Sequence, residues 1–497
     1  MQTCPCATAH NPQAAHLPTS PPILDLPPEI LQEILSLAYS DDKDSHGIPV
    51  HLTRRLALFK KNILPVCRRF YDLGLHALYS HVHIGHPRAF DVFRHELAKN
   101  PKLGAYVKCL DFSDFTSIGL GRTRKMNREI QMVTCETITD ALLQMPNLRE
   151  FLVSEALEDD LGKDVLQTVF NRQKYLEAVD FCGASSDSFV SSMTSLKLEL
   201  GSLEYLSRVG FHECVSLPAQ VYEHMLPRLG RLERLDLTHT HVSARALMSI
   251  PERARITHLS LAKCRNVSPK AIVGLLTTHP AVTSGSLEWL SLQWTDLSAE
   301  DLTAVLEGLK RTAPKLRYLS LYGLPVEEAH LEQIGESVEE LSLGFADVEI
   351  DSLITAFSGR EKLRYLDLTG NPHITLWTVG DMRLLRGIPS VRTWEFDLTK
   401  ILLKMTDVRL PGYTVVIGQG RRGWIFRGEK NKDALNVEHH CASPEVRSAH
   451  YCQHVLGMDM GSTEAWAGAS RKIDCSGVQY GGGLERGIYL YYAYRIR

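Results

Sequence analysis

The chain has 497 residues, a formal net charge of −3 at pH 7 and a pI of about 6.7. Its hydrophobic fraction of 44% and charged fraction of 23% are typical of a globular protein, and no apolar run approaches the roughly 20 residues that a membrane-spanning helix needs. This composition argues against a membrane protein, and the weak net charge provides no overall field for nucleic acid. Because the chain is too long for one ordinary core, we expect several domains or one repeat array, with a protein as partner.

The first segment, residues 1–22, contains no arginine and no apolar core of the kind that signal peptides carry. We therefore expect a disordered leader rather than a targeting sequence. The eleven cysteines of the chain are scattered mostly singly, several of them inside apolar patterns. Free thiols used as small buried hydrophobes indicate a reducing compartment, so the predicted location is cytoplasmic, nuclear or both.

Residues 23–84 predict two amphipathic helices. Pro27 and Pro28 precede a helical pattern of apolar residues that begins at Ile30, and prolines are favoured where a helix starts. A longer polar stretch separates it from a second pattern beginning near Val66. The motifs L-P-x-E-I-L-x-x-I-L and V-C-R-R-F-Y, followed by Leu78-Tyr79, resemble the F-box, in particular that of fungal F-box proteins.

The resemblance implies a partner. In F-box proteins these helices bind a Skp-type adaptor, which connects them to a cullin and thereby to a ubiquitin ligase. By position, the adaptor-binding residues implied for this chain are Leu26, Pro27, Ile30, Leu31, Ile34, Leu35, Val66, Cys67 and Phe70. Two features differ from many F-boxes, which have tryptophan where Phe70 and Tyr71 stand and a shorter connection between the helices. The alternative is that these helices only cap the open end of a solenoid.

A predicted linker helix over residues 85–105 leads into residues 106–400, where the pattern L-x-x-L-x-L recurs about eleven times at intervals of roughly 22 to 31 residues, with one near 41. Clear copies begin at Leu232, Ile256, Leu287, Leu316 and Leu363. This periodicity predicts a leucine-rich-repeat solenoid, in which each motif is a short strand with its leucines in the core and helical segments lie between the strands.

The outward positions of these strands predict a concave binding face. Its central row is small or acidic except at Leu152 and Gly210; the other members are Asp111, Asp180, Asp236, Ser260, Ser291, Ser320, Ser342, Asp367 and Glu395. Aromatic side chains are expected beside this row. Because tyrosine and tryptophan often anchor interfaces, the predicted target-binding residues are Trp289, Tyr318, Tyr322, Tyr365, Asp236 and Asp367. The alternative is that the tyrosines only favour strand formation.

Residues 401–497 predict a β-rich cap over the last repeat. A G-x-G-x-x-G motif at 418–423 is followed by a further strand pattern rather than a helix, which favours a hairpin over a dinucleotide site. Histidines and cysteines gather between His439 and Cys475, but without the paired spacing of zinc sites. The basic run 122–128 is expected to be a solvated loop, with contact to an acidic or phosphorylated target as the alternative.

The sequence contains no ordered set of nucleophile, base and orienting group, so we expect no catalytic residue, no metal and no cofactor. The expected fold class is α/β, with an F-box helical segment, a leucine-rich-repeat solenoid and a β-rich cap. Two functions remain open at this stage. One is a substrate receptor of an SCF-type ubiquitin ligase, and the other is a protein-interaction scaffold unconnected to ubiquitination.

Overall fold

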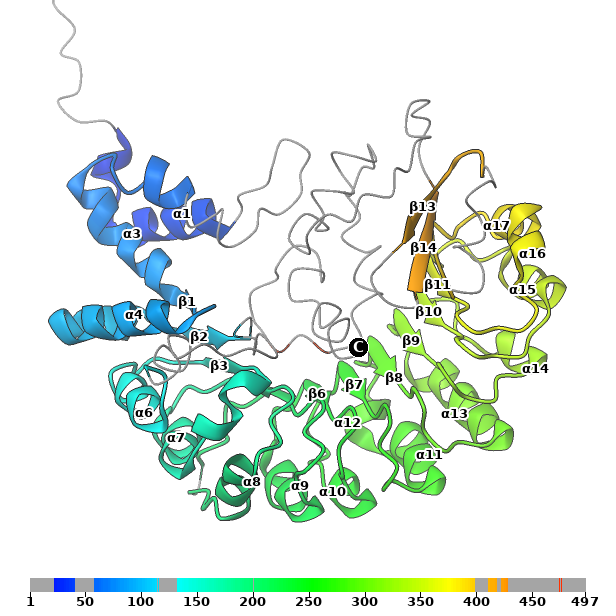
Figure 1. The fold of residues 1–497 in the computed structure, drawn as a ribbon, viewed down its shortest axis with the longest axis horizontal. Coiled ribbons are helices and arrows are strands. Elements are labelled where there is room, and N and C mark those ends of the chain that lie inside the picture. The colour runs from blue at the N-terminus through cyan, green and yellow to red at the C-terminus, as the bar shows by residue number, and fades with distance from the viewer. Residues whose placement is uncertain are drawn as a thin grey trace, which may run out of the picture.

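The structure is a computed structural model that describes residues 22–40, 58–113, 115, 132–199, 201–397, 410–417, 422–427, 473 and 475. It has an α/β fold built on one 14-stranded sheet, in the order β1 to β12, then β14 and β13. Each strand from β1 to β11 pairs in parallel with the next strand along the chain. The sheet curves so that strands line the inner side and helices the outer side (Figure 1). The predicted leucine-rich-repeat fold is confirmed.

The repeat strands are short; β2 to β12 follow the predicted motifs, whereas β1 lies before the first motif, in the segment 23–84 that was predicted to be helical. They are β1 His81–His83, β2 Cys109–Phe112, β3 Glu150–Val153, β4 Ala178–Phe181, β5 Arg208–Gly210, β6 Arg234–Asp236, β7 His258–Ser260, β8 Trp289–Ser291, β9 Tyr318–Ser320, β10 Glu340–Ser342, β11 Tyr365–Asp367 and β12 Thr393–Asp397.

Helices on the outer side connect these strands. They are α4 Pro87–Lys99, α6 Cys135–Leu143, α7 Lys163–Gln167, α8 Asp187–Thr194, α9 Ala219–Met225, α10 Ala244–Met248, α11 Pro269–Thr278, α12 Pro280–Thr283, α13 Ala299–Thr312, α14 Glu328–Leu331, α15 Ile350–Phe357, α16 Leu376–Gly380 and α17 Arg383–Gly387. Shorter helical turns are η2 Pro101–Tyr106, η3 Glu155–Asp160, η4 Thr168–Arg172 and η5 Leu226–Arg228.

The repeats share one continuous apolar core between the sheet and the outer helices. In the repeat of β8, Leu287, Leu290 and Leu292 are completely buried. The following helix, α13, begins at a capping box in which the Ser298 hydroxyl accepts the N–H of Asp301 and the Asp301 carboxylate accepts the N–H of Ser298. Such a cap stabilises a helix by about 1 kcal/mol. Both the strand and the helix of this repeat form where the sequence predicts them.

A left-handed residue follows most repeat strands. Glycine occupies this position at Gly183, Gly323 and Gly370, whereas Glu213, His239, Lys263, Trp294 and Phe345 adopt the same positive φ without being glycine. Seven of these residues, from Gly183 to Phe345, donate their backbone N–H to a carbonyl of the next repeat, for example Lys263 to Gln293 at 2.7 Å. These hydrogen bonds between repeats offset a conformational cost of roughly 1–2 kcal/mol per residue.

The cysteines after two of these turns fill the core, as predicted. Cys214 and Cys264 are buried, and their thiols donate to the carbonyls of Phe181 at 3.0 Å and Leu237 at 2.9 Å. Burial raises the pKa of the Cys264 thiol to about 12. A thiol that remains protonated is neither a nucleophile nor a ready metal ligand.

The N-terminal helices form a second, smaller core beside the solenoid (Figure 1). After the short turn η1, Pro22–Asp25, helix α1 spans Pro28–Ser40 and α3 spans Arg68–Ser80, and the two pack together. Their core contains Leu31, Leu35, Tyr39, Phe59, Leu64, Phe70 and Ala77. The chain then enters β1, which pairs with β2, so the helical segment is joined directly to the repeat sheet.

The far end of the sheet is covered by a hairpin. Strands β13, Tyr413–Ile417, and β14, Arg422–Arg427, are antiparallel to each other, and β14 is antiparallel to β12. Gly423 therefore lies in a strand rather than at the start of a helix, which confirms the hairpin interpretation of the glycine motif. The leader to residue 21, the basic run 122–128 and the histidine and cysteine residues from His439 to His454 lie outside the described residues.

Candidate functional site

The N-terminal helices expose apolar side chains on α1. Ile30 is 51% exposed, and Ile34 and Leu37 are also exposed. Their spacing of four and three residues places them on one face of the helix. Leu31 and Leu35 lie on the adjacent face, about 100° around the helix, and are buried in the small core. Helix α1 therefore has two apolar faces, of which one is buried in the described part of the N-terminal core and the other is exposed.

The implied adaptor residues thus separate into three groups by exposure. Pro27, Ile30, Ile34 and Val66 are exposed, whereas Leu31, Leu35 and Phe70 are buried and hold α1 against α3. Leu26 and Cys67 are partly exposed, and the Cys67 thiol accepts the N–H of Phe70 at 3.4 Å as the N-cap of α3.

Arg69 fixes the Leu-Pro segment in place. Its guanidinium donates to the backbone carbonyls of Leu24 and Leu26, the latter at 2.6 Å. The sequence interpretation missed Arg69, and it also missed two exposed apolar residues of the same region, Leu37 and Tyr71. Leu37 could have been found by extending the helical period of Ile30 and Ile34 by one turn.

The central row of the concave face lies as predicted, but it is buried. Asp236 in β6 accepts from the N–H of Thr238 at 3.0 Å, from Nδ1 of His212 at 3.1 Å and from the backbone N–H of Ile473 at 3.0 Å. Burial by itself raises the pKa of Asp236, but His212 and Thr238 outweigh burial and hold the pKa below its ordinary value. Asp236 is thus an ionised acceptor inside the fold.

Three other acidic members of the row, Asp111, Asp367 and Glu395, are also engaged in hydrogen bonds. The Asp111 carboxylate lies 3.2 Å from His81 Nε2, and the Asp367 carboxylate accepts from the Ser342 hydroxyl at 2.7 Å. Tyr365 donates its hydroxyl to Glu395. These side chains connect neighbouring strands, which explains their burial and gives the row a structural role.

An aromatic stack lies beside the central row on neighbouring strands. Trp289 and Tyr318 are parallel, with ring centroids 4.4 Å apart and an interplanar angle of 5°, and His258 stacks on the other side of Trp289 at 6.5 Å. Burial and the nearby Arg234 lower the pKa of His258 to about 3. Trp289 and His258 are partly exposed, whereas Tyr318 is buried. Two of the four predicted aromatic residues, Trp289 and Tyr318, therefore form a stack, in which Trp289 is the partly exposed member, whereas Tyr365 is buried on β11.

Tyr322 lies elsewhere, since it follows β9 rather than belonging to it. Its ring contacts Trp294 and Phe345 with centroids 5.8 and 5.3 Å apart. A Cβ on Gly344 would lie 2.1 Å from the Tyr322 ring, so this glycine makes room for the aromatic cluster. Tyr322 therefore belongs to the edge of the solenoid and not to the stack around Trp289.

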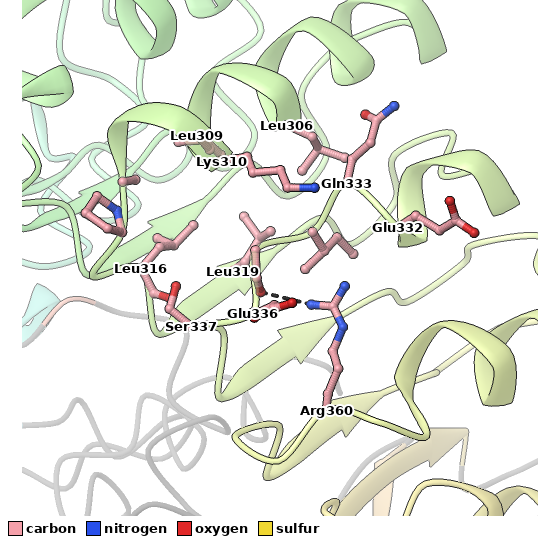
Figure 2. Close-up of a pocket in the computed structure, with 14 residues that line it drawn as sticks. Leu306, Leu309, Lys310, Leu316, Leu319, Glu332, Gln333, Glu336, Ser337 and Arg360 are labelled. Carbon is pink, nitrogen blue, oxygen red and sulfur yellow. Dashed lines mark hydrogen bonds between the residues drawn. The ribbon is translucent and has the colours of Figure 1, made fainter.

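A pocket of 310 Å³ opens between α13 and the segment that precedes β10 (Figure 2). Leu306, Leu309 and Leu316 form its apolar wall. Arg360 points into it and donates to the carbonyls of Gly335 at 2.9 Å and Leu331 at 3.2 Å. Because these bonds engage the guanidinium, Arg360 joins two repeats and does not offer an open anion site.

Within the described residues, no group of three or more histidine, cysteine, aspartate or glutamate side chains is arranged to hold a metal ion. In that same part of the chain, no helix is both long and apolar enough to cross a membrane.

Comparisons with known proteins identify one curated relative. No protein-family model matches the chain. Over 445 residues the chain is 28% identical to the F-box protein YLR352W of Saccharomyces cerevisiae. The aligned region covers 77% of this chain and 55% of that protein. The chain thus spans about half the length of this relative.

Among solved structures, the crystal structure of the Rad7 and Elc1 complex in yeast matches with a TM-score of 0.45 and 14% identity, covering 73% of this chain and 87% of that chain. The parallel repeat sheet gives the leucine-rich-repeat fold independently of this match, and the curated relative is an F-box protein. The resemblance to F-box/leucine-rich-repeat proteins that the motifs predicted is therefore confirmed.

Proposed function

We propose that this chain is the substrate-recognition subunit of an SCF-type ubiquitin ligase of the cytoplasm or nucleus. Residues 23–84 bind a Skp-type adaptor, which links the chain to a cullin, and residues 106–400 hold a protein target on the concave face. The observation that carries this proposal is the exposed stripe of Ile30, Ile34 and Leu37 on α1. It lies on the helix with the F-box motif.

The energetics support a partner for this stripe. Complete burial of one aliphatic side chain of this size contributes roughly 1.5–3 kcal/mol. Three neighbouring side chains that are partly exposed can therefore contribute several kcal/mol when a partner covers them, which is enough for a central anchor of an interface. Their removal leaves the small core of Leu31, Leu35 and Phe70 intact, so adaptor binding and folding can be separated by mutation.

Adaptor binding is tested by a pull-down with purified Skp-type adaptor. Ile30→Asp/Ile34→Asp should reduce adaptor recovery at least about tenfold, with unchanged circular dichroism because both side chains are exposed. Leu143→Asp is the matched control, since Leu143 is an exposed aliphatic residue at the end of repeat helix α6. If the wild-type chain recovers no adaptor, the scaffold function replaces the ligase function.

For the target we propose the stack around Trp289 as the anchor. Proteins that accumulate when the gene is deleted provide candidate targets, and each is then tested for direct binding. Trp289→Ala should weaken target binding at least about tenfold and leave adaptor binding unchanged. Trp377→Ala is the matched control, because Trp377 is 83% exposed and lies on α16. Equal loss in both variants, or in neither, would contradict this assignment.

A further inference from the structure

Two described residues from the last part of the chain, Ile473 and Cys475, lie on the concave face of the repeat sheet. Ile473 and Cys475 are each 1% exposed, and they contact Asp236 and Leu152 of the central row. The backbone N–H of Ile473 donates to Oδ2 of Asp236 at 3.0 Å, although these residues are 237 positions apart in the chain. We call these two described residues, Ile473 and Cys475, the inner segment.

The surface beneath the inner segment differs from the rest of the central row. The row is small or acidic except at Leu152 and Gly210, and Cys475 lies against both exceptions. It shares a buried cluster with Leu152 and Cys109, and a Cβ on Gly210 would lie 3.2 Å from its sulfur. The row therefore becomes apolar, or lacks a side chain, at the place where the thiol of Cys475 packs.

Asp236 provides the polar half of this contact. One of its carboxylate oxygens accepts the N–H of Thr238, and the other accepts both His212 and Ile473. Because the carboxylate is completely buried and ionised, each donor that it loses leaves a poorly compensated charge. A peptide N–H at the position of Ile473 is thus favoured whichever chain supplies it.

We propose that the inner segment is an internal ligand of the concave face and occupies, between β2 and β6, a peptide site that a target uses. This proposal rests on the target-binding function proposed above. The site recognises an extended peptide that presents a backbone N–H to Asp236 and, two residues later, a small apolar side chain to Leu152 and Gly210. Because a tethered ligand has a high effective concentration, a target binds here only by displacing the inner segment.

Docking of the inner segment is tested by alkylation of the native, full-length protein with iodoacetamide, followed by mass spectrometry. In the wild type, Cys475 should react as slowly as the core residue Cys264. Ile473→Pro removes the N–H and should raise the rate at Cys475 at least about tenfold, whereas Ile473→Ala keeps the N–H and should raise it less. A wild-type Cys475 that reacts as fast as in urea would overturn the proposal.

Competition is tested with a fluorescent synthetic peptide of residues 468–480. The peptide should bind the full-length Ile473→Pro protein at least about tenfold more tightly than it binds the wild type, because the variant no longer fills its own site. Equal affinity for both proteins, or binding to neither, would overturn the internal-ligand role. Neither experiment contains an adaptor or a target, so its failure is distinguishable from failure of the ligase function.

Discussion

His258 should make the stability of the repeats depend on pH. Its pKa is lowered to about 3 by burial and by Arg234, from an ordinary value of 6.5. At pH values between about 3 and 6.5, this histidine is protonated in the unfolded chain but neutral in the folded chain. The contribution of His258 to stability is therefore complete above pH 6.5 and decreases as the pH falls from 6.5 toward 3.

The magnitude follows from the size of this window. At pH 5 the solution lies 1.5 units below the unfolded pKa of 6.5, and each unit corresponds to about 1.4 kcal/mol. His258 should thus lower the free energy of unfolding by roughly 2 kcal/mol between pH 7 and pH 5, and by less to the extent that solvent reaches the partly exposed ring.

The measurement is urea unfolding followed by tryptophan fluorescence at pH 7 and pH 5. His258→Gln removes the titrating group while keeping a polar side chain of similar size. Because other groups titrate in both proteins, the informative quantity is the difference between wild type and variant. The wild type should lose roughly 2 kcal/mol more than the variant. Equal losses would refute the reasoning and show that the imidazole accepts a proton within the folded stack.

Three further perturbations test the fold. Gly323→Ala should destabilise the protein by at least about 1 kcal/mol in thermal unfolding, since φ is +75° and the new Cβ would lie 2.5 Å from the Trp294 ring; Gly359→Ala, with open space around it, is the control. Leu290→Ala, in the core of β8, should lower the free energy of unfolding by about 2–5 kcal/mol in urea. The Cys264 thiol, with its pKa raised to about 12, should be alkylated at pH 8 far more slowly in the native than in the unfolded protein.

The solenoid could be predicted because its signal is local and repeated. Leu287, Leu290 and Leu292 follow the L-x-x-L-x-L pattern, in which the last two leucines are two residues apart as side chains on one face of a strand are, and the same pattern recurs along the chain. The start of α1 could also be predicted, since Pro28 is its first residue and proline is favoured there. In both cases a few neighbouring residues contain all the information.

The candidate site was harder to predict because it depends on contacts between repeats. Because Tyr322 follows the Y-L-S-L motif, the sequence groups it with Trp289 as a target-binding residue. In the structure it lies in the turn after β9, where its ring packs over Gly344. The strand pattern predicts that the Asp367 carboxylate faces outward from the sheet and is available to a target. In the structure this carboxylate accepts the hydroxyl of Ser342 on the neighbouring strand and the N–H of Thr369. The contacts of both side chains depend on how neighbouring repeats align, and the sequence of one repeat motif does not specify that alignment.

The two halves of the concave face now suggest different roles. Between β2 and β6 the carboxylate of Asp236 is bound by the chain itself through Ile473, so a basic target gains little there without displacing the inner segment. From β7 to β9 the stack is anchored by buried Tyr318 and presents a partly exposed Trp289. A target that first contacts Trp289 meets a preformed surface and can then compete for the neighbouring peptide site. Trp289→Ala should therefore reduce target binding even in the Ile473→Pro background, whereas Ile473→Pro alone should increase it.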